Sequence, residues 1–148
     1  MLCDIIIAGE KAKFGQLEIN LGIIPGGGAT QKLTHAVGKS RAMQICLTGE
    51  MITAQQAVSW GLVNSVHPPE KVIDAAVEIG NQITRQSKII TRMVKESINN
   101  AFELTLQEGL EAEYRISYST YATDDIKEGM QAFIEKRKPS FTINKSYL

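Results

Sequence analysis

The sequence predicts a mixed α/β fold, with short strands in its first half and helices in its second half. Two observations lead to this class. Residues 5–8 form an apolar, β-branched run, which is typical of a buried strand. From residue 72 onward, apolar side chains recur at the three- and four-residue spacing of amphipathic helices. The chain therefore reads as the end of an α/β core followed by a helical region.

Turn and capping signals divide the first half into short elements. Strands are expected at residues 5–8, 13–15 and 62–67, the first of them buried on both faces. Helices are expected at residues 29–37, about 40–47 and 54–60. Gly38 should end the first helix, Ser40 should be the N-cap of the second, and Thr53 with Gln56 forms a capping box that opens the third.

The second half is expected to be helical as far as Pro139. Four helices are expected, at residues 72–83, at 90–102, after the capping box Thr105 to Glu108, and from Asp124 onward. Pro68 and Pro69 separate the two halves. The predicted organisation is an α/β region at 1–67, a helical region at 68–139 and a loosely ordered tail at 140–148.

Composition places the protein in the ordinary globular class. Its 148 residues are 43% hydrophobic and 22% charged, and 16 basic residues balance 16 acidic ones. This balance gives no indication of a nucleic-acid or membrane-surface partner. Cys3 and Cys46 are too few for a disulfide framework and are expected to be buried thiols in a reducing compartment. We expect no membrane-spanning helix and no secretory signal.

Several motifs resemble cofactor sites but fail on a required residue. Gly38-Lys39-Ser40 would end a phosphate-binding loop, but Leu33 stands where that loop needs its first glycine. A dinucleotide fingerprint that begins at residues 26–28 fails at Gln31. His35 and His67 lack cysteines or carboxylates at metal-ligand spacing, so both are interpreted as structural or surface histidines.

Glu18 is the strongest candidate for chemistry. It is expected at the end of an apolar strand region, just before the glycine-rich turn at 26–28. Leu17, Ile19 and Leu21 surround it in the sequence and would favour its protonated form by partly desolvating the carboxyl group. Isolated acids beside such turns often perform acid/base chemistry, but a surface glutamate is an equally good reading of the pattern alone.

From Cys3 to Pro139 the chain resembles the enoyl-CoA hydratase (crotonase) superfamily, and most closely its short-chain members from mitochondrial fatty-acid oxidation. The motifs that carry the resemblance follow the family's order along the chain. They are residues 3–12, 14–16, 18–19, 26–31, 36–40, 47–49, Ala57 with 61–63, 123–125, 128–129 and 132–138. The resemblance implies the C-terminal part of a ββα spiral fold, followed by a helical region for oligomerisation.

The same resemblance implies a function. Such hydratases add water to a trans-2-enoyl-CoA thioester to give a 3-hydroxyacyl-CoA. Glu18 falls on the glutamate that donates a proton to the α-carbon, Gly26 on a position that lines the acyl pocket, and Phe133 and Lys136 on positions that contact the CoA nucleotide. No metal or redox cofactor is implied. The expected partners are the acyl-CoA substrate and further copies of the chain, as a trimer or a dimer of trimers. The expected location is the mitochondrial matrix, with the cytoplasm as the alternative.

The chain departs from the family pattern in several places. Leu17 replaces the usual proline before the glutamate, and Ala29 stands where glycine is usual. The family's other catalytic glutamate and its oxyanion N–H donors fall before the position of Met1, so the chain reads as a C-terminal portion. Two alternatives stay open: another acyl-CoA enzyme of the superfamily, such as an isomerase or a hydrolase, or a non-catalytic assembly module.

Overall fold

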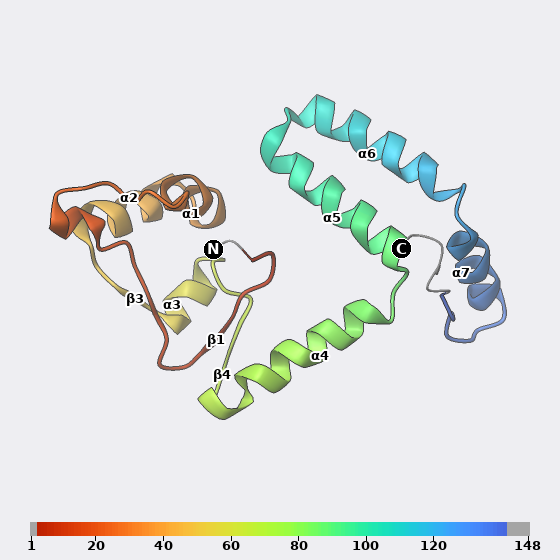
Figure 1. Cartoon of the computed structure of the whole chain (residues 1–148), viewed down its shortest axis with the longest axis horizontal. Helices are drawn as coiled ribbons and strands as arrows, with labels where there is room; N and C mark the ends of the chain where they lie inside the picture. The colour runs from red at the N-terminus through yellow and green to blue at the C-terminus, as the bar shows by residue number, and fades with distance from the viewer. Residues whose placement is uncertain (1–2, 142–148) are drawn as a thin grey trace. The chain divides into compact units, whose positions relative to one another are not determined.

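The computed structural model describes residues 3–141, and the elements along them are drawn in Figure 1. Contacts divide the chain into two units, Met1–Glu78 and Ile79–Leu148. The first unit holds the strands and several short helices, and the second holds long helices. Most of the predicted tail, residues 142–148, lies outside the described residues.

Two small sheets form in the first unit. Strand β1 (Ile7–Gly9) pairs in parallel with β4 (Ser65–His67), and β2 (Lys13–Phe14) pairs antiparallel with β3 (Ile52–Thr53). Strand β3 was not predicted, because a two-residue strand carries no periodicity.

The first strand begins later than predicted, at Ile7 rather than Ile5. The N–H of Ile6 donates to the side-chain carbonyl of Asn64 at 2.9 Å, so a side chain replaces the ladder partner there. Ile5 is 42% exposed, and within the strand only Ala8 is buried, at 5% exposed, while Ile7 and Gly9 are half-buried, so the prediction of burial on both faces is wrong.

The last strand is also shorter than predicted. The N–H groups of Leu62 and Val63 both donate to the carbonyl of Ala57, at 2.9 and 3.2 Å, and so terminate the preceding helix α3 (Ala54–Ser59). Both side chains are buried in the core, which explains why their apolar character resembled a strand. The apolar character of Leu62 and Val63 correctly indicated that they are buried, but it did not predict their backbone conformation.

Helices α1 (Ala29–Val37) and α2 (Lys39–Thr48) are packed against each other in the first unit. Ser40 is not the N-cap of α2, contrary to the prediction. Gly38 takes that position at φ 82°, with its N–H bonded to the carbonyl of Thr34 and its carbonyl accepting from the N–H of Ala42. One glycine thus ends one helix and begins the next, which leaves no room for a serine cap.

The core of this unit gathers side chains from all its main elements. Leu33, Ile45, Ala54 and Ala57 are each at most 2% exposed. The capping box of α3 is confirmed, since Thr53 and Gln56 exchange side-chain to backbone hydrogen bonds. The short helix η2 (Pro69–Lys71) follows the predicted break and leads into α4 (Val72–Thr84), which crosses the boundary between the units.

The second unit holds α5 (Lys88–Glu103), α6 (Leu106–Thr120) and α7 (Asp124–Ile134). Figure 1 shows α5 and α6 side by side after a short connection. The capping box of α6 is confirmed: Thr105 donates its N–H to Glu108 at 3.0 Å, and hydrogen bonds from Thr105 lower the pKa of Glu108. Helix α7 ends at Ile134, although the chain was expected to be helical as far as Pro139, so the basic residues 136–138 lie beyond its last turn.

A buried polar contact joins the starts of α5 and α7. The Ser87 hydroxyl donates to the carboxylate of Asp125, and these side chains belong to residues that are 3% and 9% exposed. Ser87 is also the N-cap of α5, because its oxygen accepts from the N–H of Ile90 at 3.2 Å. No local sequence signal connects a serine to an aspartate this far along the chain.

We predict that Ser87→Ala destabilises the fold by about 1–3 kcal/mol, because it removes a cap and leaves the buried Asp125 carboxylate without that hydroxyl donor. The measurement is urea unfolding followed by far-ultraviolet circular dichroism. Ser119→Ala is the matched control: its hydroxyl donates to the carbonyl of Ile116 on an exposed helix surface, so a change within about 0.5 kcal/mol is expected. Equal costs for the two variants would contradict the prediction.

Candidate active site

Glu18 does not end a strand. It begins the short helix η1 (Glu18–Leu21), which Gly22 closes at φ 71°. The N–H groups of Gly22 and Ile23 donate to the carbonyls of Ile19 and Glu18, at 3.1 and 3.2 Å. Strand β2 stops at Phe14, so the following residues have no ladder to join and turn back on themselves. The backbone that carries the carboxylate is therefore a compact turn.

A neighbouring amide engages the Glu18 carboxylate. With its nitrogen facing Glu18, the side-chain amide of Gln16 donates to both carboxylate oxygens, at 3.3 and 3.2 Å. This orientation follows from hydrogen bonding, because the opposite one would set oxygen against oxygen. Glu18 itself is half-buried, while Leu17 and Ile19 are 48% and 39% exposed. Gln16 belongs to one of the family motifs, at residues 14–16, but no role was predicted for it.

The end of α2 holds the η1 turn in place. A Cβ atom at Gly49 would lie 2.8 Å from Nδ2 of Asn20 and 3.1 Å from Cγ2 of Ile19. Gly49 also has φ 66°, which a side chain would disfavour. Only glycine therefore lets α2 approach the turn that carries Glu18 this closely.

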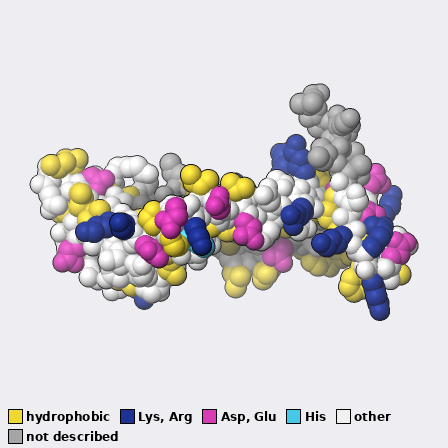
Figure 2. All heavy atoms as spheres, turned by 90° about the horizontal axis from the view of Figure 1, so that it is seen from below, with side chains coloured by type: hydrophobic (Ala, Val, Ile, Leu, Met, Phe, Trp, Pro, Cys, Tyr) yellow, Lys and Arg dark blue, Asp and Glu magenta, His cyan; other side chains and the backbone are white. Residues whose placement is uncertain are grey.

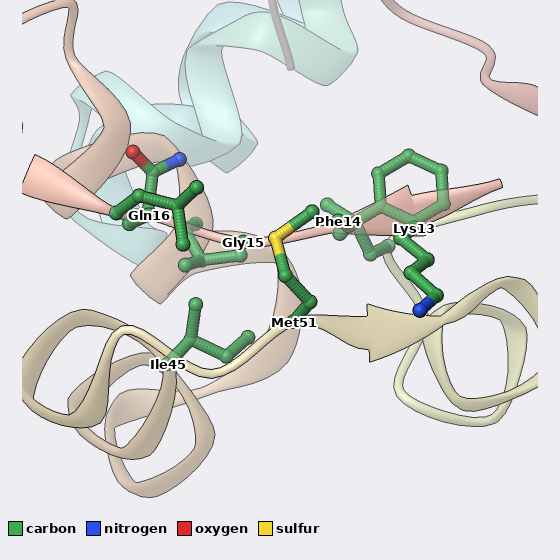
Figure 3. A pocket seen from close by; sticks show the side chains of 9 residues that line it. Lys13, Phe14, Gly15, Gln16, Ile45 and Met51 are labelled. Atoms are coloured by element: carbon green, nitrogen blue, oxygen red, sulfur yellow. The ribbon is translucent and has the colours of Figure 1, made fainter.

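A cavity of about 290 Å³ opens beside this segment. Figure 3 shows the Met51 side chain reaching from just before the start of β3 toward Gly15 and Phe14, with Ile45 on a neighbouring helix. A Cβ at Gly15 would collide with the sulfur of Met51 and lie 3.2 Å from the carbonyl oxygen of Glu50, so a side chain here would displace Met51 and crowd the backbone. The cavity is lined mainly by apolar side chains, and Gln16 and Leu17 also line it. An apolar ligand segment fits such a lining.

The pKa of the Cys46 thiol depends on burial and on the charge of the Glu18 carboxylate. Burial raises the pKa of its thiol, and the negative charge of Glu18 raises that pKa further. Cys46 is half-buried on α2, whereas Cys3 is exposed, so the prediction of two buried thiols is wrong for Cys3. Cys3 precedes β1, where no described element covers it.

The predicted site residues are divided between the two units of the chain. Gly26 is exposed in the turn before α1, where its carbonyl accepts from the N–H of Gly28 at 2.9 Å. Phe133 and Lys136 belong to the second unit, at the end of α7. Phe133 is 82% exposed, and its carbonyl accepts from the N–H of Lys136 at 3.2 Å. The structure thus presents two groups, Glu18 with Gly26 and Phe133 with Lys136.

Residues 3–141 contain no cluster of three histidine, cysteine or acidic side chains arranged to hold a metal ion. His67 instead shares a hydrogen bond of 2.9 Å with the hydroxyl of Ser65 on the same strand. None of the helices within the described part of the chain has the length and apolar character needed to cross a membrane.

The family model described as enoyl-CoA hydratase/isomerase matches residues 1–144. The chain belongs to this family. It is 55% identical over 141 residues to a mitochondrial enoyl-CoA hydratase of Pongo abelii and 52% identical to a probable mitochondrial enoyl-CoA hydratase of Dictyostelium discoideum. It superposes with a TM-score of 0.91 and 39% identity on an enoyl-CoA hydratase structure from Geobacillus kaustophilus. The expected fold, the C-terminal part of the crotonase fold, is confirmed.

These matches cover most of this chain and only part of each relative. They include 95% of this chain but 49% and 51% of the two eukaryotic relatives, and 55% of the Geobacillus protein. The chain therefore spans about half the length of the curated relatives that it matches.

We predict that Glu18→Gln speeds alkylation of Cys46 at pH 8 by about two- to fivefold, because removing the nearby negative charge lowers the thiol pKa and increases the thiolate fraction. The measurement is the iodoacetamide reaction rate in a Cys3→Ser background. Glu10→Gln removes the same charge from an exposed turn and should leave the rate unchanged. Identical rates in both variants would contradict the proximity of Glu18 and Cys46.

Proposed function

We propose that this protein is an enoyl-CoA hydratase that adds water to trans-2-enoyl-CoA to give 3-hydroxyacyl-CoA, with Glu18 as the proton donor to the α-carbon. The proposal depends on the half-buried carboxylate of Glu18 in a chain of this family. This carboxylate accepts hydrogen bonds from the Gln16 amide, and the turn that carries it packs closely against Gly49. The names of the relatives at about half identity support it.

The proposed reaction requires a group that both holds and releases a proton. The water oxygen bonds to the β-carbon, the proton that the water loses replaces the one that Glu18 gives to the α-carbon, and the thioester oxygen carries enolate charge in between. Gln16 suits both states of Glu18. Its amide nitrogen donates to the ionised carboxylate, and its amide oxygen accepts from the protonated acid once the amide is turned. The addition of water leaves the net oxidation state of the substrate unchanged, so the proposed reaction requires no redox cofactor, and we propose no metal for it.

Substrate binding is proposed to use both units. Gly26 lines the acyl site, where its lack of a side chain leaves space: a Cβ there would meet no atom within 4 Å. Lys136 is proposed to pair with a phosphate of the CoA nucleotide, and the exposed Phe133 ring to contact the adenine.

We predict that Glu18→Gln lowers kcat for hydration of crotonyl-CoA by about 10²–10⁴-fold, because the amide cannot donate an acid proton to carbon. The assay follows the loss of enoyl thioester absorbance, using the protein as it occurs in the cell. Glu10→Gln is the matched control and should retain full activity. Near-normal turnover by Glu18→Gln, with an unchanged Tm, would refute the assigned role.

The family description also names isomerases, which gives a second candidate reaction. An isomerase moves the double bond of a 3-enoyl-CoA and adds no water. Incubating the protein with crotonyl-CoA and with 3-hexenoyl-CoA separates the two. Formation of 3-hydroxybutyryl-CoA supports hydration, whereas conversion of 3-hexenoyl-CoA to the 2-enoyl isomer alone would favour isomerisation.

The helical unit is proposed to assemble copies of the chain into a trimer or a dimer of trimers. Helix α6 carries an apolar stripe at four-residue spacing that is largely exposed: Leu106 (81%), Leu110 (52%), Tyr114 (63%) and Tyr118 (58%). Figure 2 shows apolar side chains interspersed with charged ones on the face that it presents. A continuous stripe of this kind is typical of a surface that packs against another protein surface.

We predict that Leu110→Glu shifts the protein to a smaller species in light scattering coupled to size exclusion, because it sets a charge in the proposed contact. Arg115→Glu is the control, since Arg115 lies on another side of α6 with its side chain 80% exposed. An unchanged mass for Leu110→Glu would exclude this stripe from the assembly.

A mitochondrial location is proposed from the names of the Pongo and Dictyostelium relatives. The Geobacillus match shows that similarity alone does not fix the compartment. Subcellular fractionation with an antibody to the protein would decide it.

A further inference from the structure

Helix α7 ends in a backbone conformation that disfavours its own residue. Lys136 has φ 53°, whereas every other residue with positive φ in the described chain is a glycine. Its N–H donates to the carbonyl of Phe133 at 3.2 Å, and the N–H of Arg137 donates to the carbonyl of Ala132 at 3.0 Å. This pair of bonds is the Schellman motif, which usually carries glycine at this position.

Helix α3 provides the internal comparison. It ends in the same pair of bonds, from Gly61 to the carbonyl of Val58 and from Leu62 to the carbonyl of Ala57, and there the left-handed residue is glycine, at φ 83°. If the motif at α7 served only to end the helix, glycine would serve it better. A lysine held in this conformation therefore points to a use for its side chain.

The chain after Lys136 is held by a fork of hydrogen bonds. Arg137 donates through Nη1 and Nη2 to the two oxygens of Glu128, at 2.6 and 3.0 Å, and through Nε to Glu135 at 2.5 Å. Glu128 also accepts from the N–H of Ser140 at 2.7 Å. These bonds lower the pKa of Glu128 to about 2, so its carboxylate is ionised throughout the neutral range. Glu128 thus clamps Arg137 and Ser140 to α7.

The hydrogen bonds of this clamp also determine which of the two neighbouring cationic side chains is available to bind a ligand. The guanidinium of Arg137 is occupied by two carboxylates. The ammonium of Lys136 is exposed and has no hydrogen-bond acceptor among residues 3–141. The exposed ring of Phe133 lies one helical turn before it. A free cation beside an exposed aromatic ring suits a nucleotide phosphate and its base.

We propose that Glu128 and Arg137 are positioning residues that force Lys136 into the left-handed conformation, so that its ammonium is presented to a phosphate of the CoA nucleotide. This inference rests on the proposed function for the identity of the ligand. It goes beyond that function in assigning a role to the Glu128–Arg137 pair and to the unfavourable cap. A merely structural clamp would affect all substrates alike.

The test compares CoA with pantetheine, which lacks the phosphorylated nucleotide. The protein as it occurs in the cell is titrated with each compound by calorimetry, and KM is measured with crotonyl-CoA and crotonyl-pantetheine. Lys136→Gly should weaken CoA binding about five- to tenfold, leave pantetheine binding unchanged, and leave Tm unchanged or higher. Lys127→Gln, which removes an exposed lysine paired with Asp124 on the same helix, is the control.

The positioning role is tested by a double-mutant cycle. Arg137→Gln should raise KM for crotonyl-CoA about three- to tenfold with kcat retained, and should have no further effect once Lys136 is glycine. Equal effects of Arg137→Gln on both substrates, additive effects in the double variant, or unchanged CoA affinity in Lys136→Gly would each overturn the proposal. Discrimination in the calorimetry without hydration activity would support the clamp while refuting the hydratase assignment.

Discussion

The packing of α2 into the core is the constraint on which the candidate site depends. Ile45 is 2% exposed, which fixes the rotation of the helix about its axis. Once that rotation is set, Ile45 forms a wall of the cavity, Cys46 faces the charge of Glu18, and Gly49 meets the η1 turn at the helix end. A carboxylate on a short turn has little rigidity of its own, so the site takes its geometry from this helix.

Local chemistry was sufficient to predict most helices and their caps. The capping boxes at Thr53 and Thr105 and the helix breaks at Gly38 and Gly49 follow from residues within one turn of each other. The errors came from longer-range contacts. Asn64 replaced a strand partner for Ile6, and β3 exists only because β2 lies beside it. No periodicity within a short window contains that information.

The same distinction applies to the site. Glu18 was found because an isolated acid beside a glycine-rich turn is a local signal, and the family resemblance gave it a role. Gln16 and Gly49 were missed as its neighbours, because their relation to Glu18 appears only after folding. The basic residues 136–138 fall in the part of the chain that was expected to be helical, and nothing in the sequence distinguishes them from one another. The structure does, since Arg137 is paired with the carboxylates of Glu128 and Glu135 and Lys136 is not.

The smallness of the two sheets affects how copies of the chain can associate. Each sheet has two strands of two or three residues, so within the described residues every strand has one edge without a strand partner. Unpaired edges invite addition of a strand from another molecule, but such short strands would offer only a few backbone hydrogen bonds to an incoming chain. Ordered growth by strand addition is therefore disfavoured, and association has to rely on side-chain surfaces.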